Sequence, residues 1–466
     1  MFDLLIPFCV IVGFILGIIS GLFPGIHTNN FALLLLALAP AALEVGFSPL
    51  HIAIIILANS ITHTFLDIIP SIYLGAPDAD TALTVLPGHR MLMDGRGPEA
   101  VRLSALGSAG SIAASGIIVL PLTLFFGYMY PFIQSNMALV LILIIMLMVG
   151  TEKGEQIIGQ GRYVHHKYKL YALILLLASG ALGYYAFKLE SLMNPGFDSS
   201  TILLALLSGL FGASTLLISL FSNSSIPLQV VGEYSLSGRM IVRGVLTGSV
   251  AGSMVAWLPG ISSAIAATLV GLLSHNTKLD KDVSTAGTID NNDSANVHNQ
   301  VHTNIFENLG DESEQREDQN SMEYIVSISS VNTANATFGL AALYVIGRPR
   351  SGAMVAILDL LGNIPDMRTL LLFYGVVAIT SIMAYFTTIY IGNTIHKPLR
   401  KLDYRTLAMT VISFLAIMVF FFNGVFGIAI FMLSIALGML PHFLGVRKMH
   451  CMGVLLIPVI LYFIQF

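Results

Sequence analysis

Long apolar runs separated by short polar segments make up most of the chain. An α-helix needs about 20 apolar residues to cross a bilayer, and seven runs here are nearly free of charged residues. Together with shorter and interrupted runs, the pattern predicts an all-α polytopic membrane protein of roughly a dozen helices. The seven runs span residues 103–126, 138–149, 170–187, 202–221, 370–391, 407–422 and 425–440.

The composition agrees with this pattern. Of the 466 residues, 55% are hydrophobic and 10% are charged, whereas about a quarter of the residues in a soluble domain are charged. So large an apolar excess does not fit inside one water-soluble core, and the lipid bilayer is the expected environment. The net charge of −4 indicates no basic surface for nucleic acid.

Cysteines and catalytic motifs narrow the function further. Cys9 and Cys451 lie in apolar runs and are expected to be small buried hydrophobic residues, with no disulfide framework and no zinc site. The sequence has no His-Glu-x-x-His, Gly-x-Ser-x-Gly or phosphate-binding loop motif. We expect no metal, no cofactor and no enzymatic activity, and a carrier driven by an ion gradient.

Basic residues are concentrated in a few short loops, which the positive-inside rule places in the cytoplasm. The hydrophilic stretch 275–321 is rich in Asp, Glu, Asn and Ser and is predicted to be a flexible loop. The segment from Leu4 has no positive residue before it and is predicted to be a retained helix, not a signal peptide. The basic clusters are Arg90, Arg96 and Arg102; Lys153, Arg162, Lys167 and Lys169; Arg239 and Arg243; Lys397, Arg400, Lys401 and Arg405; and Arg447 with Lys448.

An internal repeat divides the chain into residues 1–235 and 236–466. A Gly-rich run ending in Pro-Gly-Ile occurs once in each half, and five residues match at one constant offset. A second pair of motifs follows, with Thr62–Phe65 matching 335–338. The five matches are Gly13, Gly17, Pro24, Gly25 and Ile26 with Gly248, Gly252, Pro259, Gly260 and Ile261.

The halves are predicted to be inverted in the membrane. In the first half, the chain after the second motif reaches the basic turn at 90–102, which is expected in the cytoplasm. The equivalent turn of the second half, near 362–368, lies one helix before the basic loop at Lys397 and is expected outside. Equivalent loops on opposite sides are typical of inverted-topology repeats.

Each Pro-Gly pair lies inside an apolar run, where it unwinds a helix. In lipid, such a break is tolerated only where it faces protein or a water-filled cavity. A half-helix that starts after the break offers unpaired N–H groups and positive partial charge to an anion; capping of the helix is the alternative role of the polar residues there. The predicted substrate-binding residues are Pro24, Gly25, His27, Thr28, Asn29, Asn30, Pro259, Gly260, Ser262 and Ser263.

Polar residues also interrupt the apolar runs in the second motifs. Asp67 is the carboxylate that we expect to be buried, and with neighbouring oxygens it could bind Na⁺ or take up a proton. Arg348 and Arg350 offer planar forks that suit a carboxylate or phosphate, or they form a loop at the interface. The predicted ion-coupling residues are Asn59, Thr62, His63, Asp67, Asp78 and Asp80, and further substrate contacts are Asn332, Asn335, Arg348 and Arg350.

These motifs resemble the large permease subunit of tripartite tricarboxylate transporters. The Gly-rich runs into both Pro-Gly-Ile segments carry the resemblance, as do 72–88, 95–100 and 331–336. The resemblance is distant, as expected for a divergent, archaeal branch. Residues 347–350 read Gly-Arg-Pro-Arg where the family has Gly-Ile-Pro-Gly, a departure that leaves the substrate open. The resemblance implies a conduit for carboxylates such as citrate in a prokaryotic cell membrane, working with a small membrane subunit and an extracytoplasmic binding protein.

Two other functions remain open. Residues 259–268 also resemble a short segment of proposed polyprenyl-phosphate translocases, which favours a lipid-linked phosphate as substrate. The third reading is an intramembrane enzyme or a scaffold. His63 and Asp67 share one helix face at i, i+4 and would be the acid–base pair of such an enzyme.

Overall fold

The computed structural model describes residues 4–23, 28–74, 85–152, 164–189, 202–221, 227–232, 236–257, 263, 266–267, 270, 298–347, 349, 351–399 and 404–464. All regular elements of these residues are helical. They are α1 (Leu5–Leu22), α2 (Thr28–Ala37), α3 (Ala39–Glu44), α4 (Pro49–Leu66), α5 (Ile68–Tyr73), α6 (Val85–Met93), α7 (Gly97–Ser135), α8 (Met137–Gly150), α9 (Val164–Lys188), α10 (Leu203–Leu207), the π-helix η3 (Ser208–Ala213), α11 (Ser214–Phe221), α12 (Gly238–Trp257), α15 (His298–Ile346), α16 (Gly352–Leu361), α17 (Met367–Thr394), α18 (His396–Leu399), α19 (Tyr404–Leu444), the 3₁₀ helix η4 (Lys448–Met452) and α20 (Gly453–Ile464).

The helices have the length and apolar character of membrane spans. Among the described residues, seven helices are long and apolar enough to cross a bilayer, and the end of α7 with α8 forms a bent pair at 78°. Three shorter apolar helices lie beside them. α19 is two helices joined at Gly424, whose φ of 64° breaks the run, as the separate apolar runs 407–422 and 425–440 predict. The all-α polytopic class is confirmed.

Local sequence signals set several helix ends. α4 begins at Pro49 because the Ser48 side chain accepts a hydrogen bond from the His51 N–H at 3.3 Å. α16 ends at Gly362, which adopts a left-handed φ of 67°. The Asp366 side chain then caps α17 by accepting from the Thr369 N–H at 2.9 Å. These ends fix the tight turn between α16 and α17.

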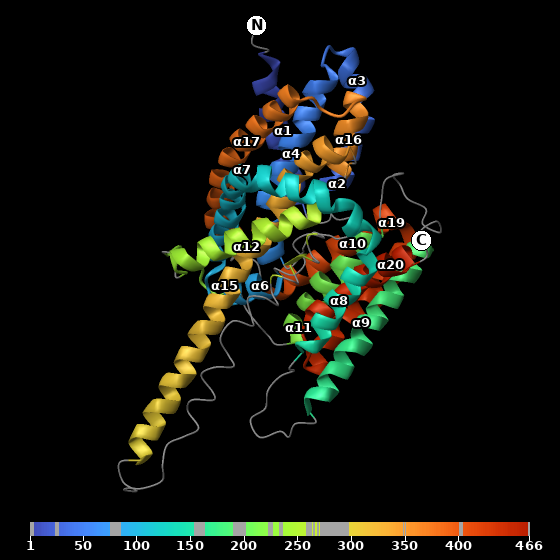
Figure 1. Cartoon of the computed structure of the whole chain (residues 1–466). Helices are drawn as coiled ribbons and strands as arrows, with labels where there is room; N and C mark the ends of the chain where they lie inside the picture. The colour runs from blue at the N-terminus through green and yellow to red at the C-terminus, as the bar shows by residue number, and fades with distance from the viewer. Residues whose placement is uncertain are drawn as a thin grey trace.

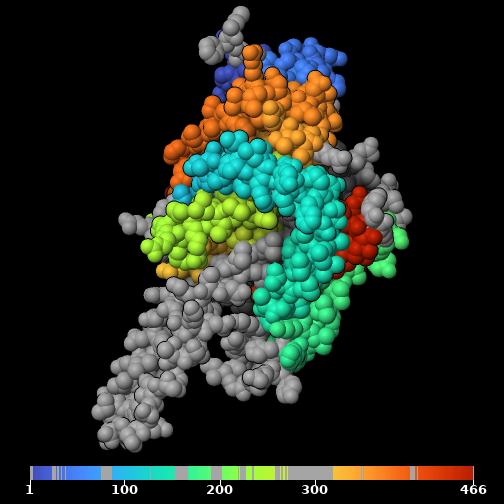
Figure 2. All heavy atoms as spheres, in the orientation of Figure 1, coloured from blue at the N-terminus to red at the C-terminus, as the bar shows by residue number. Residues whose placement is uncertain are grey.

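The helices form two bodies, each with its own apolar core. The first body contains α1, α2, α4–α7, α12 and α15–α17 around one large core cluster. The second body contains α8–α11, η3, α19, η4 and α20 around another. Figure 1 shows the second body beside the lower half of the first, and Figure 2 shows α8 and α9 covering one of its sides.

The two sequence halves interlock within the first body. α7 packs on α12 and α15, and α17 packs on α1 and α4. Hydrogen bonds tie both contacts: Ser330 Oγ donates to Gly107 O at 2.9 Å, and Thr388 Oγ1 donates to Phe65 O at 3.3 Å. The long helix α7 of the first half therefore packs on the α12–α15 pair of the second half, and the long helix α17 of the second half packs on the α1–α4 pair of the first.

The repeated glycines bring α1 against α4 and α12 against α15. A Cβ added at Gly17 would overlap the Thr62 side chain, and one added at Gly252 would come within 2.8 Å of the Ala334 Cβ. Small residues that let helices approach closely are common in membrane helix pairs. Thr62 and Ala334 therefore occupy equivalent positions in the two helix pairs. The sequence motif instead matches Thr62 with Asn335, the next residue in α15.

One sequence prediction needs correction. The stretch 275–321 is predicted to be a flexible loop, but α15 begins at His298, so 298–321 is helical. Figure 1 shows this part of α15 extending beyond the rest of the molecule. The segment has no proline and one glycine, and it is rich in Glu and Gln, which are good helix formers. Polarity indicates exposure to water here, not a lack of helix.

The basic clusters also include side chains that are paired or buried. Arg96 pairs with Glu99 at 2.8 Å and with Asp318 of α15 at 2.5 Å. Lys448, predicted in an exposed loop, is 8% exposed. The count of Lys and Arg along the sequence therefore overstates the charge that these turns present to solvent.

Candidate functional site

The first broken helix is visible as two separate elements. α1 ends at Leu22 and α2, ten residues long, begins at Thr28. The Thr28 hydroxyl is buried without a hydrogen-bond partner among the described residues. Asn29 and Asn30 lie in the first turn of α2. The predicted site residues Pro24, Gly25 and His27 lie outside the described residues.

A second break in the first half positions Asp67. Pro70 has no N–H to donate to the Leu66 carbonyl, and the helix divides there into α4 and α5 with Asp67 at the junction. The Asp67 side chain is 3% exposed. A carboxylate at bilayer depth is costly, by about 2.5–3.5 kcal/mol on insertion scales, and is a functional candidate by default.

Asp67 and Thr64 meet α15 of the second half. Asn332 Nδ2 donates to Asp67 Oδ2 at 2.8 Å, and Thr333 Oγ1 donates to Thr64 Oγ1 at 3.3 Å. All four side chains are buried. We call Thr64, Asp67, Asn332 and Thr333 the polar layer, because together they form a buried hydrogen-bonded contact between the two halves.

The other predicted coupling residues face α1 instead. Ser20 of α1 bonds His63 Nδ1 at 3.1 Å and accepts from Asn59 Nδ2 at 3.2 Å. Asn59 Oδ1 and Thr62 Oγ1 are buried without a hydrogen-bond partner among the described residues. The structure therefore divides the set that the sequence grouped: Asp67 faces α15, while Asn59, Thr62 and His63 lie at the contact with α1.

The second-half break is described in part. α12 ends at Trp257, which is fully buried. Ser263, also buried, accepts from Asn335 Nδ2 at 3.1 Å. Ser263 and Asn335 are thus adjacent, as two residues of one site would be. The remaining predicted residues Pro259, Gly260, Ser262, Arg348, Arg350, Asp78 and Asp80 lie outside the described residues.

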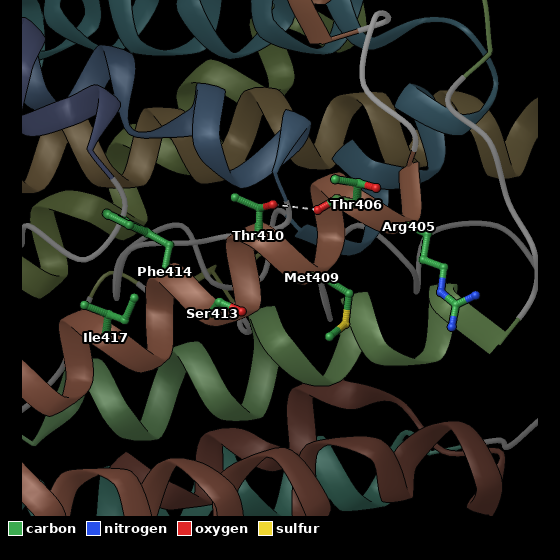
Figure 3. A pocket seen from close by; sticks show the side chains of 7 residues that line it. All are labelled: Arg405, Thr406, Met409, Thr410, Ser413, Phe414 and Ile417. Atoms are coloured by element: carbon green, nitrogen blue, oxygen red, sulfur yellow. Dashed lines mark hydrogen bonds between the residues drawn. The ribbon is translucent and has the colours of Figure 1, made fainter.

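An open pocket of about 620 Å³, which the sequence did not predict, lies on the first half of α19. Phe414 at its edge lies 6.1 Å, ring to ring, from Phe23, the residue before Pro24. Figure 3 shows the lining side chains along one stretch of α19, with Thr410 Oγ1 donating to Thr406 O at 2.7 Å. The lining residues are Arg405, Thr406, Met409, Thr410, Ser413, Phe414 and Ile417.

A signal for this pocket exists in the sequence. Thr406, Thr410 and Ser413 follow one another at i, i+4 and i+7 in an otherwise apolar helix, a spacing that puts them on one face. The opposite face of α19 packs in the second body through residues such as Leu415 and Val419. The polar face therefore lies outside this core, and Arg405 adds a planar cationic fork to it.

Together these features define a polytopic membrane transport protein. Helix breaks and a buried carboxylate at the contact between two interlocked halves are features typical of membrane carriers. The model of the tripartite tricarboxylate transporter TctA family matches residues 8–453. The chain belongs to this family and is a transport protein.

One relative is similar over almost its whole length. An uncharacterized protein of Methanocaldococcus jannaschii is 26% identical over 464 residues, which cover 98% of each chain. The distant, archaeal character expected from the sequence agrees with this relative. No solved structure matches the chain.

Proposed function

We propose that the chain is a secondary transporter that moves a small organic anion, of the di- or tricarboxylate kind, across the cell membrane together with Na⁺ or H⁺. One observation carries the proposal. Asp67 is a buried carboxylate at a helix break in the first half, and it accepts a hydrogen bond from Asn332 of the second half. Any relative movement of the two halves would change the hydrogen bond and the surroundings of this carboxylate.

The cation would act at Asp67 and on the α1-facing side of α4. A buried carboxylate is poorly solvated, so binding of Na⁺ or a proton stabilises it. Asn59 Oδ1 and Thr62 Oγ1 add buried oxygens with free lone pairs among the described residues. Hard cations prefer oxygen ligands of these types. Ion binding here would change the packing of α4 on both α1 and α15.

The anion would enter between the two bodies. The N-terminus of α2 at Thr28 favours negative charge, and the α19 pocket offers Arg405 and hydroxyl groups. Phe23 and Phe414 connect these regions. Arg348, Arg350, Ser263 and Asn335 are the proposed contacts from the second half. The family also supports a small membrane subunit and an extracytoplasmic binding protein as partners.

Uptake into proteoliposomes tests the proposal. The purified chain is reconstituted, and entry of labelled citrate and labelled succinate is followed with an inward Na⁺ gradient, an inward proton gradient or neither. We expect at least one acid to accumulate above equilibrium under one gradient and not without it. Empty liposomes and a Lys397→Ala variant, which alters an exposed side chain, are the controls.

The same preparation separates the alternatives. If no carboxylate enters and a labelled polyprenyl phosphate changes leaflets, the chain is a lipid-carrier translocase. If neither moves, with or without added partner subunits, the transporter proposal fails and a scaffold or enzyme takes its place.

A further inference from the structure

Lys448 is a basic residue whose side chain is buried among apolar helices. Its Nζ contacts Phe211, Ser214 and Thr215, which lie in the middle of the apolar segment formed by α10, η3 and α11. The side chain is 8% exposed. An ionisable group buried in the middle of an apolar helical segment is costly, and such groups mark sites.

The ammonium group is fully matched by acceptors. An ammonium has three N–H donors and no acceptor. Lys448 Nζ donates to Phe211 O at 3.2 Å, to Ser214 Oγ at 2.9 Å and to Thr215 Oγ1 at 2.5 Å. Each donor therefore has one oxygen.

The two hydroxyls are oriented toward a cation. Ser214 Oγ donates its proton to Leu210 O at 2.6 Å, and Thr215 Oγ1 donates to Phe211 O at 2.6 Å. With the protons committed to the backbone, only lone pairs face Lys448. A neutral amine has two protons and could donate to only two of the three oxygens.

The Phe211 carbonyl lies in the π-helix η3, and Ser214 and Thr215 are the first two residues of α11, which follows it directly. π-Helical turns are rare and concentrate at functional sites. η3 is held firmly, because a Cβ at Gly209 would come within 2.5 Å of the Ser434 Cβ and 2.8 Å of Phe431 O on α19. A backbone carbonyl and two hydroxyls on a distorted helix are the ligand type that membrane carriers use for monovalent cations.

No carboxylate of the described residues lies within ion-pair distance of Lys448. The nearby acid Glu152 is engaged elsewhere: its Oε2 accepts from Arg447 Nε at 3.1 Å and lies 2.6 Å from His450 Nε2. The Phe211 carbonyl and the hydroxyls of Ser214 and Thr215 thus carry the stabilisation of the charge, as they would for a bound ion.

We propose that residues 211–215 form a monovalent-cation site in the second body, which the chain fills with its own ammonium group on Lys448. The tethered cation joins η4 to the π-helical turn without drawing an ion from solution. The second body then keeps its structure when Na⁺ is absent. Any ion dependence of transport comes from another part of the molecule.

Chemical rescue tests the site without relying on transport. Lys448→Ala removes the ammonium and leaves a space lined by the three oxygens. The full-length variant is purified in detergent, and its Tm is measured from the fluorescence of the single, buried Trp257. The chloride salts of choline, Na⁺, K⁺, NH₄⁺ and methylammonium are compared at equal ionic strength.

We expect Tm in choline to fall by about 5 °C or more, since three buried oxygens each lose the hydrogen bond from Lys448. NH₄⁺, methylammonium or Na⁺ should restore at least half of the loss, after subtracting the effect of the same salt on the wild type. Adding Ser214→Ala to the variant should abolish the rescue. Lys397→Ala, at an exposed lysine, should show neither loss nor rescue.

Two results overturn the proposal: an unchanged Tm in Lys448→Ala, or a loss that is equal in every salt. If the variant yields no folded protein in choline, it is prepared in NH₄Cl. Folded protein recovered only with NH₄⁺ or Na⁺ supports the site, and failure in every salt contradicts it.

Discussion

Asp67 is the residue whose chemistry most constrains the mechanism. Its carboxylate lies at the junction of α4 and α5, and its partner Asn332 comes from the other half of the chain. An amide donor stabilises the charged form without neutralising it. The proposed coupling role depends on this contact, because a cation bound beside Asp67 would alter its packing against Asn332.

Replacing Asp67 with Asn should uncouple transport from the ion gradient. Asn has nearly the same shape, so the helix break and the fold are expected to persist, whereas the negative charge is lost. We expect gradient-driven uptake to fall at least about ten-fold, the equivalent of losing 1.4 kcal/mol or more of coupling. Proteoliposome uptake with and without the gradient measures this, and Tm reports on the fold.

Asp366→Asn is the matched control. Asp366 is an exposed cap of α17, and hydrogen bonds from Thr369 hold the pKa of its carboxyl below the usual value. It therefore stays charged at neutral pH, and the part of its stabilising effect that comes from the charge is lost only as pH falls through this lowered pKa. Asn caps a helix as well as Asp does, so uptake should be unchanged. Full coupling in Asp67→Asn would show that the carboxylate is not the coupling group.

The sequence was enough to select individual polar residues as candidates, but not to predict which of them contact each other. A polar interruption of an apolar run was enough to select Asp67 and Asn332 separately. Their contact joins residues far apart in the chain, and no local pattern encodes it. Lys448 shows the opposite case. Beside Arg447 it resembles part of a charged loop, but its burial depends on oxygens from a segment far away in the sequence, at the junction of η3 and α11.

Among the elements, α19 combines two roles on two faces. Its apolar face belongs to the core of the second body, and the other face lines the pocket with hydroxyl groups and Arg405. The sequence predicted both halves of α19 from their apolar runs, 407–422 and 425–440. It did not predict which face would remain open, because that depends on the partner helices.

Arg405→Gln should weaken substrate binding more than turnover. The guanidinium at the pocket gives an anion a charge-assisted contact worth about 1.5–3 kcal/mol, so KM for the transported acid should rise about ten-fold or more. Arg405→Lys keeps the charge and should retain part of the affinity. Met409→Ala, which alters an uncharged lining residue, should leave KM within about two-fold. An unchanged KM in Arg405→Gln would exclude the pocket from the substrate path.

The repeated glycines act at the level of helix pairs. At Gly17 an added Cβ would lie 2.8 Å from Asn59 O, and at Gly252 it would lie 2.8 Å from the Ala334 Cβ. Both distances are too short for carbon, so the helices would have to separate. Gly17→Ala and Gly252→Ala should each cost about 1–3 kcal/mol of overpacking, seen as a lower Tm.

Gly116→Ala in α7 is the control for these two variants. An added Cβ there meets nothing within 4 Å, and alanine is the better helix former. Its Tm should stay the same or rise. Equal behaviour of all three variants would mean that close approach of the helices does not require glycine.

At the scale of the whole molecule, the two halves exchange helices. α7 follows the turn at Gly95 and packs on the second-half pair α12 and α15, while α17 follows the turn at Gly362 and packs on α1 and α4. Both glycines have a left-handed φ, 79° and 67°. The equivalence of these turns was predictable from motif order. The interlocking was not, since it depends on the packing of whole helices.

An inverted arrangement requires the two turns to lie on opposite sides of the membrane. Asp94 and Asn363 are exposed residues beside Gly95 and Gly362, and the natural cysteines Cys9 and Cys451 are fully buried, so single cysteines can be introduced without background labelling. The basic residues near Gly95 predict a cytoplasmic turn. A membrane-impermeant maleimide should therefore label Asn363→Cys in intact cells and Asp94→Cys only after the cells are opened. Labelling of both from the same side would contradict inversion, and the halves would then be parallel repeats with the interlocked helices entering from one side.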